Sequence, residues 1–267
     1  MQRLNQCLRR LLVTAVLSVF VAQAADAVVL DWDTATWTPG SLSQSYDLDP
    51  TNPGNDITLT IGGNTSFLRP DYNAPNAQTP ALSTTLHGGL TPAQNTLLLA
   101  TDFSVNTDAL TITIAFSANY TQGVTNVSFS IFDLDSGAGF QDQLRSIRGV
   151  GVDGSTVTAS YVGGPAVTTT GSFVVNGAGL SPDSGAGSNA GNLQISFSQP
   201  IRSMSFVFGN GASITDPVYQ TIGIHDINFT PVPEVNPALA AAAGCVLVGW
   251  FRQRRRRSRA SDRSTSS

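Results

Sequence analysis

Ala109 to Phe116 reads Ala-Leu-Thr-Ile-Thr-Ile-Ala-Phe, and this pattern decides the fold class. Large apolar side chains occupy every second position, with threonine or alanine between them. An extended strand directs alternate side chains to opposite faces, so a period of two gives one apolar and one polar face. The pattern predicts a half-buried β-strand.

Similar short runs recur along the chain, separated by Gly, Asn and Asp turns. The clearest are Asp56–Ile61, Val127–Asp135, Leu193–Phe197 and Met204–Phe208, and further candidates are Leu144–Val152, Ser155–Val162, Ser172–Val175 and Ile222–Phe229. Two polar stretches, Asn64–Gly88 and Asn176–Gly191, are expected to be loops. With no amphipathic helical segment of ten residues in the body, we predict an all-β fold, a jelly-roll-like β-sandwich.

Composition and charge restrict the partners of this body. The chain has 267 residues, 41% hydrophobic and 12% charged, with no Lys and a single Glu. Between Val28 and Thr230, four Arg stand against fifteen Asp, which gives a net charge of −11. Such a body should repel nucleic acid, so cations or neutral polymers are better candidate partners. Both cysteines, Cys7 and Cys245, lie outside it, so no disulfide framework is expected.

The N-terminus has the three parts of a secretory signal peptide. Basic residues end at Arg10, the apolar stretch Leu11–Val21 follows, and small residues precede a cleavage point after Ala27. Cleavage after Ala24 is the rival, and a retained membrane anchor is the alternative to cleavage. The apolar stretch is short for a span, which needs about 20 residues. We expect residues 1–27 to be a helical, cleaved signal and residues 28–230 to be the ectodomain.

The C-terminus has an extended proline-rich segment, Pro231–Pro237, then the uncharged stretch Ala238–Phe251 and a polar tail at residues 258–267. An arginine cluster lies between the last two, formed by Arg252, Arg254, Arg255, Arg256 and Arg257. Arginines hold the cytoplasmic side of a membrane helix. Fourteen apolar residues are marginal for a permanent span, which favours a transient membrane stop. A plain single-pass anchor is the alternative.

This order of motif, apolar helix and arginine cluster resembles the PEP-CTERM sorting signal, which covers residues 231–257 here. Val232, Pro233 and Glu234 match the family motif Val-Pro-Glu-Pro, and Val235 departs from its second proline. The resemblance implies a Gram-negative bacterium that makes exopolysaccharide. It also implies an exosortase, a membrane transpeptidase, as partner. The body would cross the inner membrane, stay anchored transiently, and then reach the cell surface or extracellular (biofilm) matrix.

One cluster of acidic residues is a candidate cation-binding site. Asp133 and Asp135 end a predicted strand and share one of its faces, Asp142 follows a Gly-rich turn, and Asp226 lies in the last predicted strand. Carboxylates this close need a cation or strong hydration, and oxygen-only ligands suit Ca²⁺. The alternative is that Asp133 and Asp135 are ordinary turn residues. The acidic stretch Asp47–Asp56 is expected to be a turn.

The sequence contains few residues or motifs that are typical of catalytic sites. The only histidines are His87 and His225, and we find no nucleophile elbow, P-loop or paired Glu. We therefore expect a non-catalytic surface or matrix protein. A secreted hydrolase is the less favoured alternative.

The other alternative is a carbohydrate-binding module that holds exopolysaccharide. Sugars stack on flat aromatic rings, and Trp37 with Tyr46 is the candidate platform. Residues Ser128–Leu144 and the closing stretch Ile222–Glu234 loosely resemble lectin-like or carbohydrate-module sandwiches. Exposed rings would favour the binding module, and buried rings would favour the scaffold.

Overall fold

The computed structural model describes residues 26–50, 52–73, 77–170, 174–183 and 185–233. The predicted signal helix, C-terminal helix, Glu234 and arginine cluster lie outside these residues. Within these ranges no helix is both long and apolar enough to cross a membrane.

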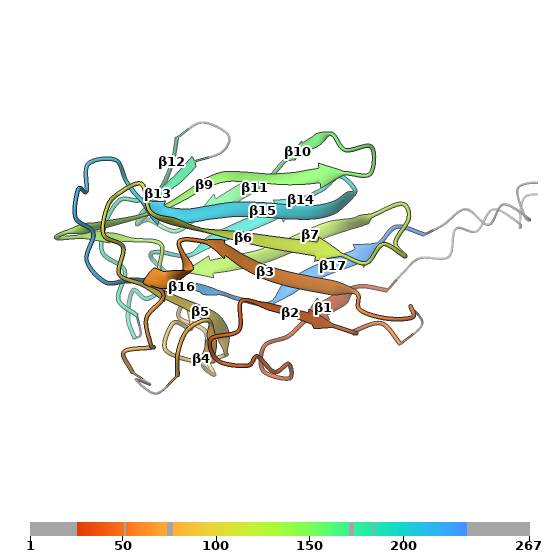
Figure 1. Cartoon of the computed structure of the whole chain (residues 1–267), viewed down its shortest axis with the longest axis horizontal. Coiled ribbons are helices and arrows are strands. Elements are labelled where there is room, and N and C mark those ends of the chain that lie inside the picture. Colours follow the sequence, from red (N-terminus) through yellow and green to blue (C-terminus); the bar gives the residue numbers. More distant parts are fainter. Residues whose placement is uncertain (1–25, 51, 74–76, 171–173, 184, 234–267) are drawn as a thin grey trace, which may run out of the picture. The chain divides into compact units, whose positions relative to one another are not determined.

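The described body is all-β and antiparallel, as predicted (Figure 1). A 3₁₀ turn covers Thr65–Phe67. The strands are β1 Val28–Leu30, β2 Ser43–Tyr46, β3 Ile57–Gly63, β4 Ala81–Ser83, β5 Thr96–Thr101, β6 Ala109–Phe116, β7 Val124–Phe132, β8 Ser136–Gly137, β9 Phe140–Gly151, β10 Thr156–Thr158, β11 Ser160–Gly163, β12 Val167–Thr170, β13 Val174–Gly177, β14 Leu193–Phe197, β15 Ile201–Asn210, β16 Gln220–Ile224 and β17 Ile227–Pro231.

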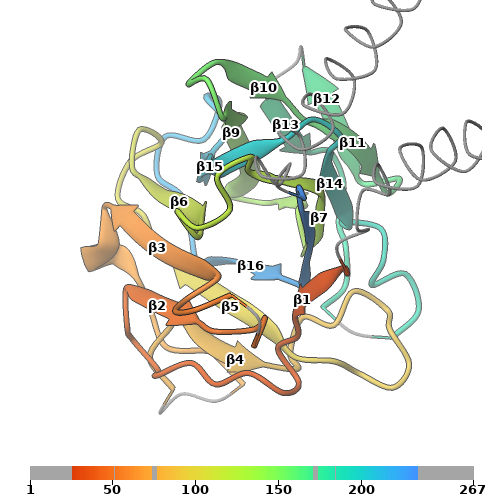
Figure 2. The same cartoon turned by 90° about the vertical axis from the view of Figure 1, so that its right-hand side faces the viewer.

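Two layers of strands enclose the core (Figure 2). One layer runs β2-β3-β6-β15-β9, and β13 and β10 share the far side of β9. The other runs β4-β5-β16-β7-β14-β11, with β17 beside the first half of β7. A single pairing of Ile201 with Val124 joins the layers at one corner, so the sheet curls. The long strands from β5 to β16 alternate between the layers along the chain.

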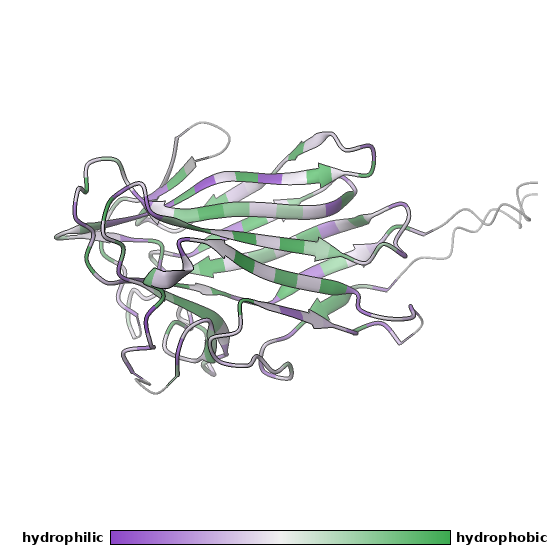
Figure 3. Ribbon diagram, viewed as in Figure 1, coloured by the Kyte–Doolittle hydropathy of each residue, from purple (hydrophilic) through white to green (hydrophobic). Residues whose placement is uncertain are grey.

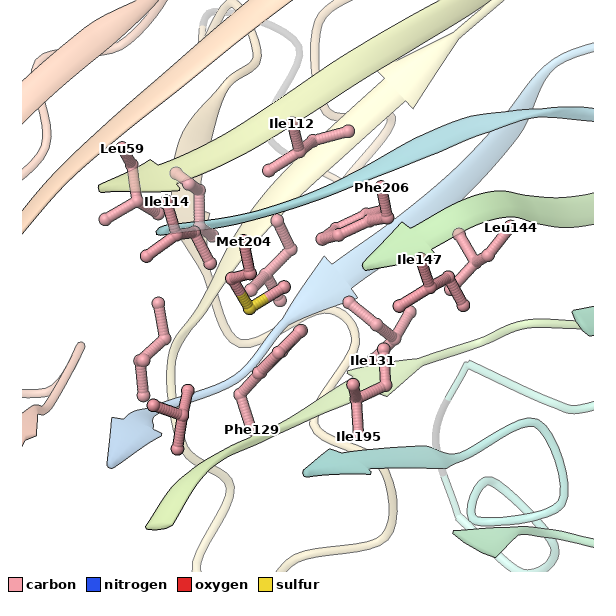
Figure 4. Close-up of a cluster of buried hydrophobic side chains, with 14 of the residues drawn as sticks. Leu59, Ile112, Ile114, Phe129, Ile131, Leu144, Ile147, Ile195, Met204 and Phe206 are labelled. Carbon is pink, nitrogen blue, oxygen red and sulfur yellow. The ribbon is translucent and has the colours of Figure 1, made fainter. Parts of the chain in front are cut away.

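The alternating pattern of the sequence builds this core (Figure 3). In β6 the buried positions are those with Leu110, Ile112, Ile114 and Phe116, as the period of two predicts. Figure 4 shows how side chains from both layers meet. The rings of Phe129 and Phe206 stack with their centres 6.1 Å apart and connect β7 to β15. Burial of such rings contributes about 1.5–3 kcal/mol each.

Several expected strand boundaries are corrected by the structure. The strand expected at Leu144–Val152 begins earlier, at Phe140. The run Ser155–Val162 forms two strands, β10 and β11, and the run Ile222–Phe229 breaks at His225-Asp226 into β16 and β17. The strand expected at Ser172–Val175 is assigned from Val174 to Gly177.

Strand β5 has no counterpart among the expected strands. Its sequence Thr-Leu-Leu-Leu-Ala-Thr lacks a period of two, and all six positions are buried. A strand covered on both faces has no reason to alternate. The stretch Asn64–Gly88, expected to be loop throughout, contains the 3₁₀ turn and β4.

Candidate functional site

A cavity of about 260 Å³ lies where the loops after β7, β13 and β15 meet. Its lining consists of Tyr72, Asp133, Asp135, Phe140, Asp142, Leu180, Ser181, Asp183, Tyr219, Gln220 and Thr221. Three of the four carboxylates predicted as a cation site are in this lining. The loops expected at Asn64–Gly88 and Asn176–Gly191 supply Tyr72, Leu180, Ser181 and Asp183.

Asp133 follows directly after β7, where the chain turns with a φ of 67°. The left-handed region is uncommon for residues other than glycine, although aspartate tolerates it better than most. The side chain is 7% exposed. Its Oδ2 atom accepts a long hydrogen bond of 3.4 Å from the hydroxyl of Thr221, and its Oδ1 atom is buried without any hydrogen-bond partner.

Asp135 and Asp142 are held together by the β8–β9 hairpin. The backbone N–H of Asp142 donates to the carbonyl of Asp135 at 2.9 Å, and the N–H of Asp135 donates to Oδ2 of Asp142 at 3.2 Å. Oδ2 of Asp135 accepts a hydrogen bond of 2.7 Å from the N–H of Ser181. Oδ1 of Asp142 accepts one of 2.8 Å from the Gln220 amide. Both oxygens of Asp142 therefore have donors.

Burial raises the pKa values of these three carboxyls, and repulsion by neighbouring carboxylates adds to the rise for Asp133 and Asp142. Burial, followed by the charge of Asp135, raises the pKa of Asp133 to about 7. Burial also raises the pKa of Asp135. Burial raises the pKa of Asp142 well above its usual range, and the neighbouring carboxylates add to the effect. The cavity lining contains no Arg, Lys or His to compensate this negative charge.

Aromatic and aliphatic side chains accompany the acidic groups in the cavity lining. Tyr72 is 45% exposed, and its ring meets that of Tyr219 edge-on at 6.0 Å. The Tyr72 hydroxyl donates a hydrogen bond to Asp183. Phe140 and the strongly exposed Leu180 also line the cavity. The cavity thus offers both apolar surface and hydrogen-bonding groups.

Asp226 is not part of this cluster, which corrects the predicted set. It lies between β16 and β17, where Oδ1 accepts a hydrogen bond of 3.0 Å from the backbone N–H of Trp32. Its other oxygen is 3.7 Å from Nε2 of His225. The break between the two strands turns this carboxylate toward the segment after β1, so its role is to hold that segment.

The predicted aromatic platform is also corrected. Trp37 is 5% exposed and Trp32 is fully buried, with their ring centres 6.2 Å apart in an edge-on contact. Tyr46 is half-buried, and its hydroxyl donates to the carbonyl of Thr36 at 2.9 Å. The expectation of an exposed Trp37 fails because the ring packs into the core, so this pair offers no ring face to a sugar and favours the scaffold at this position.

Two residues of the predicted sorting motif lie at the edge of the body. Strand β17 ends at Pro231, and the N–H of the next residue, Val232, donates to the carbonyl of Gly123 at 3.0 Å. Pro233 is exposed and is the last residue described. The predicted sorting motif thus begins directly after the final strand.

The described part of the chain contains no group of three or more His, Cys, Asp or Glu side chains placed to hold a metal ion. A cation in the cavity would therefore have to take some of its ligands from neutral oxygen atoms. Tyr72, Ser181, Tyr219, Gln220 and Thr221 were not predicted as site residues. They carry no local motif and join the site only through the fold.

No family model matches the chain, and no curated protein matches its sequence. Solved structures share a distant likeness. A family 11 carbohydrate-binding module from Clostridium thermocellum, solved with a mixed-linked tetrasaccharide, is 12% identical. It matches 80% of this chain and 100% of its own, with a TM-score of 0.31.

The K1 cleaved adhesin domain of Lys-gingipain from Porphyromonas gingivalis W83 is 9% identical, over 77% of this chain and 98% of its own, with a TM-score of 0.29. A family 22 xylan-binding domain from Paenibacillus barcinonensis is 10% identical, over 80% of this chain and 100% of its own, with a TM-score of 0.25. Likenesses at this level assign neither a ligand nor an activity to this chain.

Proposed function

We propose that the chain is an exported, non-catalytic surface or matrix protein whose jelly-roll-like body holds a saccharide unit of an extracellular polysaccharide. The observation that carries the proposal is the mixed lining of the cavity described above. A sugar has apolar C–H faces and a rim of hydroxyl groups, so its binding sites combine aromatic rings with hydrogen-bonding groups. Tyr72 and Tyr219 supply the rings, and Asp183 supplies a partly exposed carboxylate.

The position of the cavity supports a role in display. Strand β7 pairs with Pro231 at Val124, its first residue, and with Gly223 at Phe132, its last. Eight steps of about 3.3 Å separate these ends, a distance of about 26 Å. The cavity begins beyond Phe132, and the predicted sorting segment begins beyond Pro231. A body tethered through that segment would present the cavity at its opposite end.

The bonding of the carboxylates supports a non-catalytic role. A general acid or base must reach the proton that it transfers. Asp142 is 1% exposed, and both of its oxygens accept hydrogen bonds from within the protein. Asp135 accepts a hydrogen bond from the Ser181 N–H through one oxygen, Oδ2. Asp142 supports the cavity from behind.

Affinity electrophoresis of the purified full-length chain through gels containing dextran, xylan or mixed-linkage β-glucan tests the proposal. We expect retention by at least one polysaccharide. Tyr72→Ala should weaken it about 5- to 10-fold, since an aromatic contact contributes about 1 kcal/mol. The matched control is Val162→Ala, which removes an exposed apolar side chain from β11, outside the cavity. Equal retention of Tyr72→Ala and the wild type would contradict the assignment, as would release of reducing ends from the polysaccharide.

A further inference from the structure

We propose that the carboxylates of Asp133 and Asp135 bind a Ca²⁺ ion in this cavity. The proposal starts from Asp133, which lines the cavity and whose Oδ1 atom is buried without a hydrogen-bond partner. A buried polar atom without a partner is costly, and a carboxylate oxygen especially so. Such an atom is free to coordinate a cation without breaking any existing bond.

The charge balance of the cavity points the same way. Asp133, Asp135 and Asp142 are each less than 10% exposed, and Asp183 adds a fourth carboxyl to the lining. Among the described residues the ion pairs are Arg69 with Asp102 and His225 with Asp226, and neither pair reaches the cavity. Buried charges are stable when they are paired or coordinate a metal. A divalent cation would neutralise two of the carboxylates.

The kind of donor selects the ion. The lining has carboxylate, hydroxyl and amide oxygens and neither imidazole nor thiolate, which favours Ca²⁺ over Zn²⁺. Both oxygens of Asp142 already accept hydrogen bonds, so we do not count it as a Ca²⁺ ligand. Ca²⁺ accepts six to eight oxygens, including hydroxyls, carbonyls and waters. Two carboxylates with the Thr221 hydroxyl and waters therefore suit Ca²⁺, and this two-carboxylate set is compatible with the absence of a three-carboxylate cluster in the described residues.

Isothermal titration of the purified full-length chain with CaCl₂, together with thermal unfolding in Ca²⁺ or in chelator, tests the site without any sugar. We expect one ion per chain, with a Kd of about 10⁻⁴–10⁻³ M, as in extracellular modules. The melting temperature should rise with Ca²⁺ concentration, because a ligand bound only by the folded state stabilises it. Mg²⁺ should bind more weakly, because it demands a tighter octahedral shell.

Asp133→Asn keeps the shape of the side chain and removes its charge. This variant should lose at least tenfold in Ca²⁺ affinity and melt at a higher temperature than the wild type in chelator, because an uncompensated buried charge is gone. The higher melting temperature separates loss of the site from loss of the fold. The matched control is Asp153→Asn, in an exposed turn outside the cavity, which should bind Ca²⁺ like the wild type.

Absence of binding heat and of any melting shift at about 10 mM Ca²⁺ would overturn the proposal, since this is above the affinities of extracellular modules. Unchanged affinity in Asp133→Asn would also overturn it. The inference does not rest on saccharide binding. If the chain binds Ca²⁺ but no polysaccharide, the proposed function is wrong and the cation site stands. If the chain binds polysaccharide but no Ca²⁺, the cation site is wrong and the proposed function stands.

Discussion

At the scale of single residues, two buried aspartates show how hydrogen bonding decides the state of a carboxyl group. Asp56 and Asp133 are both less than 10% exposed. Asp56 accepts hydrogen bonds from the Leu48 and Asp49 N–H groups at 2.6 Å, from the Asn52 amide, and from the Tyr120 hydroxyl at 2.5 Å. Burial pushes the pKa of Asp56 upward, but these donors outweigh it and lower the pKa. Asp133 has one long hydrogen bond, and its pKa rises instead.

Asp56→Asn should therefore reduce the free energy of unfolding by about 2–4 kcal/mol at neutral pH, because buried N–H donors lose their charged acceptor. The direction in which the stability contributed by Asp56 changes with pH follows from its lowered pKa. The stabilisation is present above the unfolded pKa near 4 and is lost as the pH falls through the lower folded value. Urea unfolding from pH 7 to pH 3 should show the two proteins converging at acid pH. Asp47→Asn, exposed in the same turn, is the control, and a pH-independent difference would contradict this account.

At the scale of elements, the cavity depends on close approach between strand ends. Gly177 ends β13, and a Cβ atom there would lie 1.9 Å from the carbonyl oxygen of Asp135. That carbonyl accepts the hydrogen bond from Asp142 that closes the β8–β9 hairpin. The missing side chain at Gly177 thus allows the acidic loop to rest against β13.

Gly177→Ala should destabilise the protein by at least about 1–3 kcal/mol, since the clash is with backbone rather than with a flexible side chain. It should also weaken the Ca²⁺ response, because Asp135 must move. Gly62→Ala in β3 is the control, since a Cβ there meets nothing within 4 Å. Thermal unfolding with and without Ca²⁺ distinguishes the two, and equal melting temperatures would show that the loop absorbs the methyl group.

At the scale of the whole molecule, the two ends of the body leave from the same side. Val28 in β1 pairs with Phe229 in β17, so the start of the predicted mature chain lies close to the start of the predicted sorting segment. The acidic cavity lies beyond the other end of β7. The proposed display of the cavity away from a membrane tether requires this arrangement.

The sorting proposal predicts that Glu234→Ala retains the chain in the membrane fraction of an exosortase-bearing Gram-negative host. The wild type should be found mainly at the cell surface or in the medium. The physical reason is that a transpeptidase must recognise its motif before the apolar stretch can be separated from the body. Immunoblots of cell fractions measure the distribution, with Asn236→Ala as the control outside the core motif. Release of Glu234→Ala at wild-type levels would count against an exosortase.

Much of the architecture was predictable from local pattern. Strands with one buried face, such as β6, can be predicted from the alternation of apolar and polar residues, because solvent lies on one side and the core on the other. The sequence placed Asp133 and Asp135 on one strand face, but β7 ends at Phe132 and Asp133 turns with a φ of 67°, so it is the loop after β7 that brings both into the cavity lining. By contrast, β5 is buried on both faces and has no alternation to detect.

The rest was decided only by tertiary structure, because it depends on contacts between distant segments. Tyr72 and Tyr219 are far apart in the chain, yet their rings meet at 6.0 Å. Trp37 and Asp226 were predicted as site residues from local signals, but packing placed Trp37 in the core and turned Asp226 toward Trp32. Sequence alone determined the class of fold and the acidic character of the body, since both follow from local period and composition. Which residues line the cavity was determined by how the two layers of strands pack together.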